Sequence, residues 1–264
     1  MMKKKCINCD EYGHLYKHCT SPLNSYGMIL YRECSVLTEI EFLLVQRRHT
    51  FGYVELIRGS YDETNITDIE RLISEMTVQE RSNITTQSFD VLWKTMWYQD
   101  TITPKQLKYF KKSEEKFTKI FPMIVKIEDT LPKLWELPEW GFPKGKKEVN
   151  ETILHCAQRE CKEETNISEN EYVINESLSP IEEIFMGTDG KSYRHVYYVA
   201  KMMDSVQPCI CVDSLDESQL REIGNIQWFR LKDAIKYIRP YNHEKIDIMK
   251  YINKQLRFKQ ENTY

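Results

Sequence analysis

The stretch Gly145–Ile167 reads GKKEVNETILHCAQRECKEETNI and is the most informative segment of the chain. Its central part, residues 151–164, contains neither Gly nor Pro, and Asn150 precedes it as a suitable N-cap. We therefore expect one helix from residue 151 to residue 164. Helical periodicity predicts that its buried stripe is formed by Ile153, Leu154 and Ala157.

Three carboxylates project from one face of this expected helix. They are spaced i, i+3 and i+4, and they belong to Glu160, Glu163 and Glu164. Carboxylates crowded in this way repel one another unless a cation lies among them. Mg²⁺ takes oxygen ligands of this kind and often completes its shell with the phosphates of a substrate. A generic E-x-x-E-E is more often a solvated acidic face, so the surrounding pattern has to decide between the two interpretations.

The surrounding residues have the spacing G-x5-E-x7-R-E-C-x-E-E-x-N-I. This pattern resembles the Nudix box, G-x5-E-x7-R-E-U-x-E-E-x-G-U, in which U is a bulky apolar residue. Every charged position matches. Cys161 stands at an apolar position, where a thiol behaves as a small hydrophobe. Asn166 stands where the family has Gly, and after Gly it is Asn that best tolerates a left-handed backbone at a helix end.

The resemblance implies a hydrolase that attacks a diphosphate linked to another moiety, using water and Mg²⁺ or Mn²⁺. It implies that the metal is held by Glu160, Glu163 and Glu164, with a further backbone oxygen from Gly145. Arg159 and Glu151 would brace the loop and the helix. The implied fold is α/β, a Nudix sandwich in which a mixed sheet lies between helices.

The composition is that of a globular protein. Charged residues make up 29% and aromatic residues 12% of the 264 residues, and the net charge of −3 does not by itself indicate a nucleic-acid partner. No apolar run approaches the length of a membrane span, and residues 1–6 lack the apolar core of a signal peptide. We expect a cytoplasmic protein without membrane contact, in which the eight Cys are thiols or metal ligands rather than disulfides.

A second motif, with the spacing C-x2-C-x4-H-x4-C, lies at the start of the chain. Its candidate ligands are Cys6, Cys9, His14 and Cys19. Three thiolates and one imidazole complete a tetrahedral Zn²⁺ site that is structural, because no position stays open for chemistry. His18 is a spare nitrogen that could compete with His14. The alternative is an unstructured tail with scattered cysteines.

This second motif resembles the zinc knuckle of nucleocapsid proteins, including Gly13 just before the His. Asp10 stands where the knuckle usually has Gly. The resemblance implies contact with single-stranded nucleic acid through aromatic side chains, for which Tyr12 and Tyr16 are the candidates.

A long insertion separates the opening strands from the box. Ser25–Tyr31 and Ile40–Gln46 are rich in bulky apolar residues and predict two strands. Helical patterns follow over 67–76 and 88–97, and Thr103-Pro104 supplies an N-cap and first helical residue for a third helix. We expect a CCHC zinc knuckle over 1–20, a Nudix domain over 21–48 and 134–264, and a helical insertion domain over 49–133.

A row of lysines lines one side of the third helix, while Leu107, Phe110, Phe117 and Phe121 fall mainly on the other. The row consists of Lys105, Lys108, Lys112, Lys116 and Lys119. Such a face is usually solvated surface, and in this chain contact with RNA is an equal alternative. A last helix over 243–259 is expected to carry a further basic side, which includes Lys245.

Residues around the box are candidates for substrate binding. Lys144 belongs to a Pro-Lys-Gly approach that is typical of the family and would place its charge beside the phosphates. Residues 180–186 and 192–201 predict a hairpin. Lys191, Arg194 and His195 would lie at its mouth and meet phosphate, with ordinary turn-flanking charge as the alternative.

Residues 221–229 resemble a late segment of mRNA-decapping Nudix enzymes, in which Glu222 would lie over the metal site. The arrangement of strand, helical insert, box, hairpin and Glu222 resembles the Nudix decapping enzymes of large DNA viruses over residues 24–257. That group implies hydrolysis of the 5′ cap of mRNA to 7-methylguanosine diphosphate and 5′-monophosphate RNA, in the host cytoplasm if the chain is viral. Either Glu164 or Glu222 would take the proton from the attacking water, and the sequence does not choose between them.

Two other functions compete with cap hydrolysis. A Nudix site beside lysines would also suit a diphosphoinositol polyphosphate or a nucleoside diphosphate derivative. A catalytically silent RNA-binding module is the second alternative, against which the complete R-E-x-x-E-E argues. The sequence identifies neither protein partners nor an oligomeric state.

Overall fold

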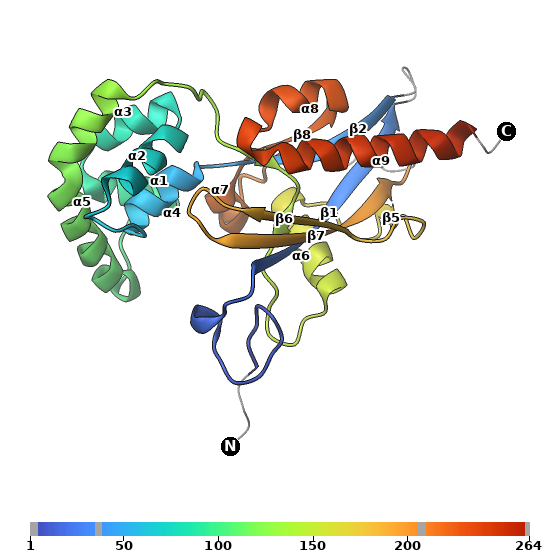
Figure 1. Ribbon diagram of the computed structural model, residues 1–264, viewed down its shortest axis with the longest axis horizontal. Coiled ribbons are helices and arrows are strands. Elements are labelled where there is room, and N and C mark those ends of the chain that lie inside the picture. The colour runs from blue at the N-terminus through green and yellow to red at the C-terminus, as the bar shows by residue number, and fades with distance from the viewer. Residues whose placement is uncertain (1–4, 35–38, 205–209, 262–264) are drawn as a thin grey trace. The chain divides into compact units, whose positions relative to one another are not determined.

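A computed structural model describes residues 5–34, 39–204 and 210–261. The chain forms two compact units, which are shown in Figure 1. The first unit contains the pattern that resembles the Nudix box, is termed the Nudix unit for that reason, and comprises Met1–Gln46, Trp140–Asp213 and Asn225–Tyr264. The second, termed the helical unit, comprises Arg47–Glu139 and Ser214–Gly224.

The Nudix unit is built on a mixed sheet. Its strands are β1 (Leu23–Cys34), β2 (Glu39–Arg47), β3 (Trp140–Gly141), β4 (Lys144–Gly145), β5 (Tyr172–Ile174), β6 (Ile181–Met186), β7 (Ser192–Met202) and β8 (Ile223–Arg230). The main path runs β3-β2-β1-β7-β5, with β4 paired to β1, β6 to β7 and β8 to β2. β1 and β7 are parallel, whereas β1 and β2 are antiparallel. The predicted opening strands and the predicted hairpin are confirmed.

Helices cover both faces of this sheet, which confirms the predicted α/β sandwich (Figure 1). Ile29 and Tyr31 of β1 join a core with residues of α8 (Leu231–Tyr237) and α9 (His243–Glu261). Side chains alternate along a strand, so Met28 and Leu30 face the other side, where α6 (Ile153–Thr165) packs on β1. A 3-10 turn, η2 (Pro240–Asn242), precedes α9.

The box helix starts later than predicted. Its N-cap is Thr152, whose side chain accepts a hydrogen bond from the His155 backbone N–H at 3.2 Å. Asn150 instead has a left-handed backbone with φ 66°, so it lacks the extended backbone of an N-cap residue, and the prediction of Asn150 as N-cap is wrong. The predicted stripe is also wrong except for Ala157, since the residues of α6 that are buried are Cys156, Ala157, Cys161 and Thr165. At the other end Asn166 is left-handed (φ 60°), as the pattern predicts.

The helical unit contains α1 (Phe51–Arg58), α2 (Ile66–Glu75), α3 (Val78–Thr86), α4 (Phe89–Trp97), α5 (Pro104–Thr130) and α7 (Glu217–Glu222). The three predicted helices correspond to α2, α4 and α5, whereas α1 and α3 were not predicted from the sequence. Thr103 and Pro104 start α5 as expected. Leu107, which was expected on its apolar side, is 43% exposed, because the buried stripe of α5 begins at Phe110.

None of the helices in the described part of the chain has the length and apolar character that a membrane crossing requires.

Candidate active site and metal cluster

Gly145 lies directly against the carboxylate of Glu160. It belongs to β4, which pairs with β1 through Tyr26 and Gly27. A Cβ atom added to Gly145 would come within 2.0 Å of Glu160 Cδ, so only glycine leaves room for the carboxylate beside this backbone. The fold therefore brings together a backbone position and a carboxylate that the box pattern assigns to one metal ion.

Arg159 connects the box loop (residues 145–151) to the box helix. Its Nε and Nη2 donate to the two carboxylate oxygens of Glu151 at 2.8 and 3.0 Å, and Nη2 also donates to the Lys146 carbonyl at 3.0 Å. Its Nη1 donates to Glu160 Oε1 at 2.8 Å and to Glu163 Oε2 at 2.9 Å. One guanidinium therefore holds the loop and two of the clustered carboxylates in place.

The electrostatics of this group follow from its contacts. The hydrogen bonds from Arg159 hold the pKa of the Glu151 carboxyl below its ordinary value. The same contacts, Glu151 first, raise the pKa of the Arg159 guanidinium. Glu151 and Arg159 are thus a fixed ion pair beneath the cluster.

The carboxylates differ in exposure. The side chain of Glu163 is 55% exposed and that of Glu160 is 13% exposed. Glu164 Oε2 accepts a hydrogen bond from the Lys144 backbone N–H at 3.2 Å, which ties the approach to the box helix. Burial raises the pKa of the neighbouring Cys156 thiol to about 12, so this thiol stays protonated. The donors offered to a metal are then hard oxygens, which fit Mg²⁺ or Mn²⁺.

The hairpin residues separate into two environments. Lys191 is exposed and its Nζ lies 2.7 Å from Asp189 Oδ2, and Arg194 Nε donates to Glu182 Oε2 at 3.1 Å. His195 does not lie at an exposed mouth, because alternation along β7 turns it inward, where it is only 6% exposed. Its Nδ1 is 2.7 Å from Glu183 Oε2.

A buried ionic network surrounds His195. Lys245 Nζ donates to Glu183 Oε1 at 3.1 Å, and the Tyr197 hydroxyl donates to Glu183 Oε2 at 3.2 Å. Burial opposes ionisation of Glu183, but His195 and Lys245 outweigh it and lower its pKa to about 2. Burial lowers the pKa of His195 to about 4, so it is neutral beside the Glu183–Lys245 ion pair.

The sequence interpretation missed this network. Lys245 was expected on the basic side of the last helix, opposite its apolar side, but it is buried at 6% exposure. A signal was present, because Lys245 lies four residues before Met249 and so shares the apolar stripe of α9. Glu183 carried no comparable signal, because it is one of two consecutive Glu in β6 and either could face inward.

Glu222 belongs to the helical unit. It is the exposed last residue of α7, and its carbonyl accepts a hydrogen bond from the Arg48 backbone N–H at 2.8 Å. The box carboxylates belong to the Nudix unit. A role for Glu222 as proton acceptor therefore stays a prediction.

The lysine row of α5 is not a continuous free strip. Lys105, Lys108 and Lys112 are exposed. Lys116 Nζ instead donates to the carbonyls of Gly59 and Tyr61, at 3.0 and 2.6 Å, and Lys119 Nζ lies 3.2 Å from Glu63 Oε1. Two of the five lysines thus have structural partners within the helical unit.

The N-terminal cysteines and histidine converge. One ligand atom from each of Cys6, Cys9, His14 and Cys19 lies within 4.8 Å of all the others. His18 is exposed, in η1 (Tyr16–His18), and is not part of this cluster. Asp10 has φ 63°, which explains why the knuckle pattern usually has Gly there.

The protonation of this cluster suits a metal. Asn8 Nδ2 donates to Cys19 Sγ at 3.2 Å, and this bond lowers the pKa of the Cys19 thiol to about 6. Burial raises the pKa of the Cys9 thiol. Of the Cys9 and Cys19 thiols, Cys19 is therefore the one that ionises first. Three sulfurs and an imidazole at this spacing form a donor set that could bind a metal ion.

Known proteins with similar sequences contain the same domain type that the box pattern indicates. The family described as NUDIX domain matches residues 127–251. The putative mRNA-decapping protein of Acanthamoeba polyphaga mimivirus is 30% identical, and the match covers 94% of this chain and 92% of that protein. The mRNA-decapping protein g5R of African swine fever virus (isolate Pig/Kenya/KEN-50/1950) is 28% identical, covering 89% of this chain and 98% of that protein. The mRNA decapping complex subunit 2 of Schizosaccharomyces pombe is 35% identical, over 39% of this chain and 12% of that protein.

The fold, the box and these matches define the class: the protein is a Nudix enzyme, a pyrophosphohydrolase. The chain belongs to the Nudix hydrolase family, within which it is similar to mRNA-decapping proteins of large DNA viruses along almost its whole length.

Proposed function

We propose that this enzyme hydrolyses the 5′ cap of mRNA, releasing 7-methylguanosine diphosphate and 5′-monophosphate RNA, in the cytoplasm of an infected host. The observation that carries the proposal is the near full-length match to viral mRNA-decapping proteins, which includes the helical unit as well as the box. A catalytically silent RNA-binding protein would not need the complete group of Arg159 and its carboxylates.

The box residues have distinct tasks in this proposal. Glu160, Glu163, Glu164 and the Gly145 carbonyl would hold Mg²⁺ or Mn²⁺, which when bound supplies polarisation of a phosphate and activation of water. Arg159 and Glu151 keep the loop on the helix. Glu164 or Glu222 would accept the proton of the attacking water.

Cations near the box would bind the substrate's phosphates. Lys144 is held at the box by its backbone bond to Glu164. Lys191 and Arg194 carry side-chain charge on the hairpin, each already close to one carboxylate. Exchange of that carboxylate for a phosphate would keep each cation paired. His195 would support this strand from the buried side as a neutral group.

The N-terminal cluster would hold one structural Zn²⁺ through Cys6, Cys9, His14 and Cys19. The exposed end of the lysine row, Lys105, Lys108 and Lys112, remains available for the phosphates of RNA. Tyr12 is 66% exposed and can stack on a base.

A side-by-side assay tests the proposal. Capped RNA, free cap analogue, a diphosphoinositol polyphosphate and a nucleoside diphosphate derivative are incubated with the enzyme in Mg²⁺ or Mn²⁺. We expect the highest kcat/KM on capped RNA, with 7-methylguanosine diphosphate as the released product. A higher kcat/KM on the inositol or nucleoside substrate would overturn the proposal.

A further inference from the structure

Three arginines of the helical unit stack on aromatic rings and form what we term the arginine–aromatic cluster. The guanidinium carbons lie over ring centroids as follows: Arg47 over Phe51 at 3.8 Å, Arg48 over Tyr98 at 4.5 Å and Arg58 over Trp97 at 4.7 Å. Arg47 and Arg48 precede α1 and Arg58 is its last residue, while Trp97 and Tyr98 are the last residue and the C-cap of α4. A stacked guanidinium keeps its N–H edges available for a further ligand.

These three guanidinium groups have no carboxylate partner among the described residues. Arg71 and Arg159, in contrast, each pair with several carboxylates. In the cluster, Arg47 Nε donates to the His49 carbonyl at 3.2 Å and Arg48 Nη1 to the Leu220 carbonyl at 2.9 Å. Both acceptors are neutral carbonyls, so neither of these two guanidinium groups is paired with a carboxylate.

The positive charges also act on one another. Burial, followed by the charge of Arg47, lowers the pKa of the Arg58 guanidinium, while Glu222 and Glu55 act in the opposite direction. The Arg58 guanidinium has no hydrogen bond or ion pair within the described part of the chain and lies over the Trp97 ring, while the Arg58 carbonyl accepts a hydrogen bond from Ser113 Oγ at 2.8 Å. Neighbouring positive charges that form no ion pair with a carboxylate favour an anionic ligand.

The backbone of Tyr98 is an outlier that supports a ligand site. Tyr98 ends α4 in the left-handed region, with φ 48° and ψ 58°, where Gly or Asn is usual. Non-Gly residues held in that region concentrate at functional sites. The strained position carries the ring that lies against Arg48, and this ring is 39% exposed. Phe51 is 48% exposed.

We propose that the arginine–aromatic cluster binds single-stranded RNA, with the guanidinium edges on phosphates and the exposed rings on bases. This rests on the proposed function and deepens it, because it names a second holding point for the RNA besides the box. It differs from the lysine row of α5, whose flexible ammonium groups provide charge without planar stacking.

Binding is measured without hydrolysis, by fluorescence anisotropy of an uncapped single-stranded oligoribonucleotide. The probe carries no cap, so the proposed cap hydrolysis does not consume it, and wild type serves as the parent of all variants. The triple change Arg47→Ala, Arg48→Ala, Arg58→Ala should weaken binding at least 10-fold. It should also reduce the slope of log K against log salt by about 2, at roughly 0.7 for each of three phosphate contacts. The corresponding triple change to Lys should retain the slope and still bind several-fold more weakly.

Tyr98→Gly separates binding from folding. Glycine relieves the left-handed backbone, so the melting temperature should not fall, while RNA affinity should decrease. Lys94→Gln is the matched control, because Lys94 is a cation of α4 that is already paired with Asp90 at 2.8 Å. It should leave affinity and salt slope unchanged. If the triple Ala variant binds RNA as tightly as its parent, the cluster is not an RNA site, whatever the outcome of the cap assay.

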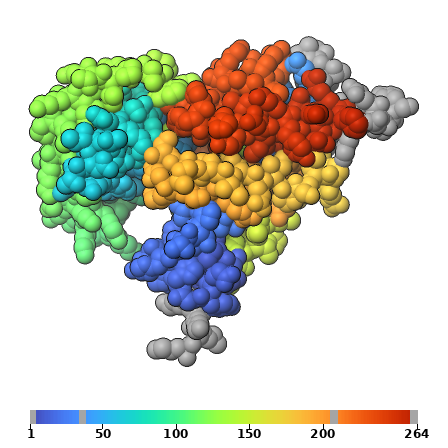
Figure 2. Space-filling model, in the orientation of Figure 1, coloured from blue at the N-terminus to red at the C-terminus, as the bar shows by residue number. Residues whose placement is uncertain are grey.

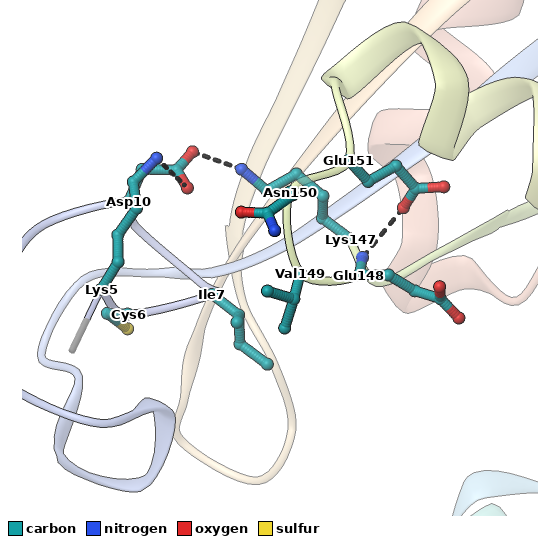
Figure 3. Close-up of a pocket in the computed structure, with 9 residues that line it drawn as sticks. All are labelled: Lys5, Cys6, Ile7, Asp10, Lys147, Glu148, Val149, Asn150 and Glu151. Carbon is teal, nitrogen blue, oxygen red and sulfur yellow. Dashed lines mark hydrogen bonds and ion pairs between the residues drawn. The ribbon is translucent and has the colours of Figure 1, made fainter.

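A second, independent observation concerns the N-terminal module. Figure 2 shows this module (blue) beside the segment that carries the box helix (yellow-green). Asp10 forms an ion pair with Lys147 of the box loop, and the Lys147 side chain is only 7% exposed. Lys146 Nζ lies 5.1 Å from the centroid of the Tyr16 ring. Figure 3 shows the small pocket between module and loop, with Asp10 bridging Lys5 and Lys147.

The position of Asp10 depends on the metal-ligand turn. The Asp10 N–H donates to the Cys6 carbonyl at 2.9 Å, and the Cys6 N–H donates to the Glu11 carbonyl at 2.8 Å. The turn between Cys6 and Cys9 therefore sets the direction in which the Asp10 carboxylate points. On the other side of the contact, the Lys146 carbonyl accepts from Arg159, which holds Glu160 and Glu163.

We infer that the N-terminal module positions the box loop, with Asp10 and Lys147 as positioning residues for the metal-binding carboxylates. The contacts run from the cysteine turn through Lys147 and Lys146 to Arg159. Ordering of the turn would then order the carboxylates. This inference rests on the box as metal site and not on cap hydrolysis.

Mn²⁺ affinity of the zinc-loaded full chain, measured by titration calorimetry, tests this inference. Asp10→Asn and Lys147→Met should each weaken Mn²⁺ binding several-fold, and the double variant should be no weaker than the poorer single one, because both remove the same contact. Lys147→Arg keeps the positive charge and should bind Mn²⁺ as tightly as wild type. Lys5→Gln is the control, since Lys5 also pairs with Asp10 at 3.0 Å but belongs to the N-terminal module and not to the box loop. Wild-type Mn²⁺ affinity in both single variants would overturn the inference.

Discussion

Among single residues, Glu163 is expected to affect catalysis strongly and the free energy of unfolding very little. Its side chain is 55% exposed and accepts one hydrogen bond, from Arg159 Nη1 at 2.9 Å. Glu163→Gln keeps the shape and removes a charge that a divalent cation needs. We expect cap hydrolysis to fall by a factor on the order of 100 or more. We expect the free energy of unfolding to change by less than about 1 kcal/mol, since the pair is exposed.

The measurement is turnover of capped RNA in Mg²⁺ together with urea unfolding. Turnover within a few-fold of wild type would remove Glu163 from the mechanism. Glu222→Gln, in the same assay, should slow turnover with less effect on Mn²⁺ binding, as expected for a proton acceptor rather than a metal ligand.

The buried pair Glu183–Lys245 should behave in the opposite way. Glu183→Gln leaves the ammonium of Lys245, which is 6% exposed, without its carboxylate. Breaking a buried pair in this manner costs about 3–5 kcal/mol of unfolding free energy. The double variant Glu183→Gln, Lys245→Met should be more stable than Glu183→Gln alone, because no charge is then buried unpaired. Urea unfolding decides, and a double variant less stable than Glu183→Gln would contradict this account.

His195 makes stability depend on pH. Its pKa is about 4 in the folded chain against an ordinary value of 6.5, so between these values the unfolded chain binds a proton that the folded chain does not. The free energy of unfolding therefore falls as pH decreases from about 6.5 to about 4. His195→Gln should flatten this part of the curve, whereas His155→Gln, at an exposed position, should leave it unchanged. Equal slopes in wild type and His195→Gln would exclude this role.

At the scale of elements, sequence periodicity predicts the long helices and misses the short ones. Phe89, Leu92, Trp93 and Met96 recur at helical spacing and are all buried in α4. The helix α3 lacks such a signal, because its buried positions include Glu80 and Arg81, and α1 shows it over a single turn only, at Tyr53, Leu56 and Ile57. In α1, Gly52 permits close packing on α2, since a Cβ there would come within 2.1 Å of the Leu72 carbonyl oxygen. In α3, a capping box of Thr77 and Glu80 starts the helix.

The helix α5 contains two lysines in different environments, which makes them a matched pair for mutation. Lys112 is exposed, whereas Lys116 donates to two carbonyls and lies over the Tyr61 ring at 5.0 Å. We expect Lys116→Ala to lower the free energy of unfolding by about 1–3 kcal/mol, because two acceptors lose a charged donor. Lys112→Ala should leave it unchanged and weaken RNA binding. Thermal unfolding and anisotropy would show this, and equal stability of the two variants would remove Lys116 from the structural role.

At the scale of the whole molecule, local patterns predict the site better than its surroundings. The box predicts the carboxylates because each chemical task requires one residue type at one spacing. The pattern C-x2-C-x4-H-x4-C similarly identifies the residues that the fold brings together. Contacts between distant segments, such as Arg48 with the α7 segment or Asp10 with Lys147, have no spacing that a sequence could display.

The N-terminal module combines a sequence pattern with contacts to distant segments, and mutations can separate the effects of the two. As a sequence motif it is a separable zinc module, and deletion of residues 1–20 should remove about one zinc ion per chain. The structure adds that Asn8, 5% exposed, bonds to the Pro22 carbonyl at 2.9 Å and to the Asn24 N–H at 2.9 Å, so the module is joined to the start of β1. Deletion should therefore leave the sheet folded but weaken Mn²⁺ binding at the box.

The double variant Cys6→Ser, Cys9→Ser should lose the zinc and weaken Mn²⁺ binding to a similar extent, because the turn that directs Asp10 is no longer held. Metal analysis and calorimetry on both proteins measure the two effects separately. Zinc retained in the double variant would show that other residues bind it. Full Mn²⁺ affinity after the deletion would show that the box loop holds its shape through Arg159 without the module.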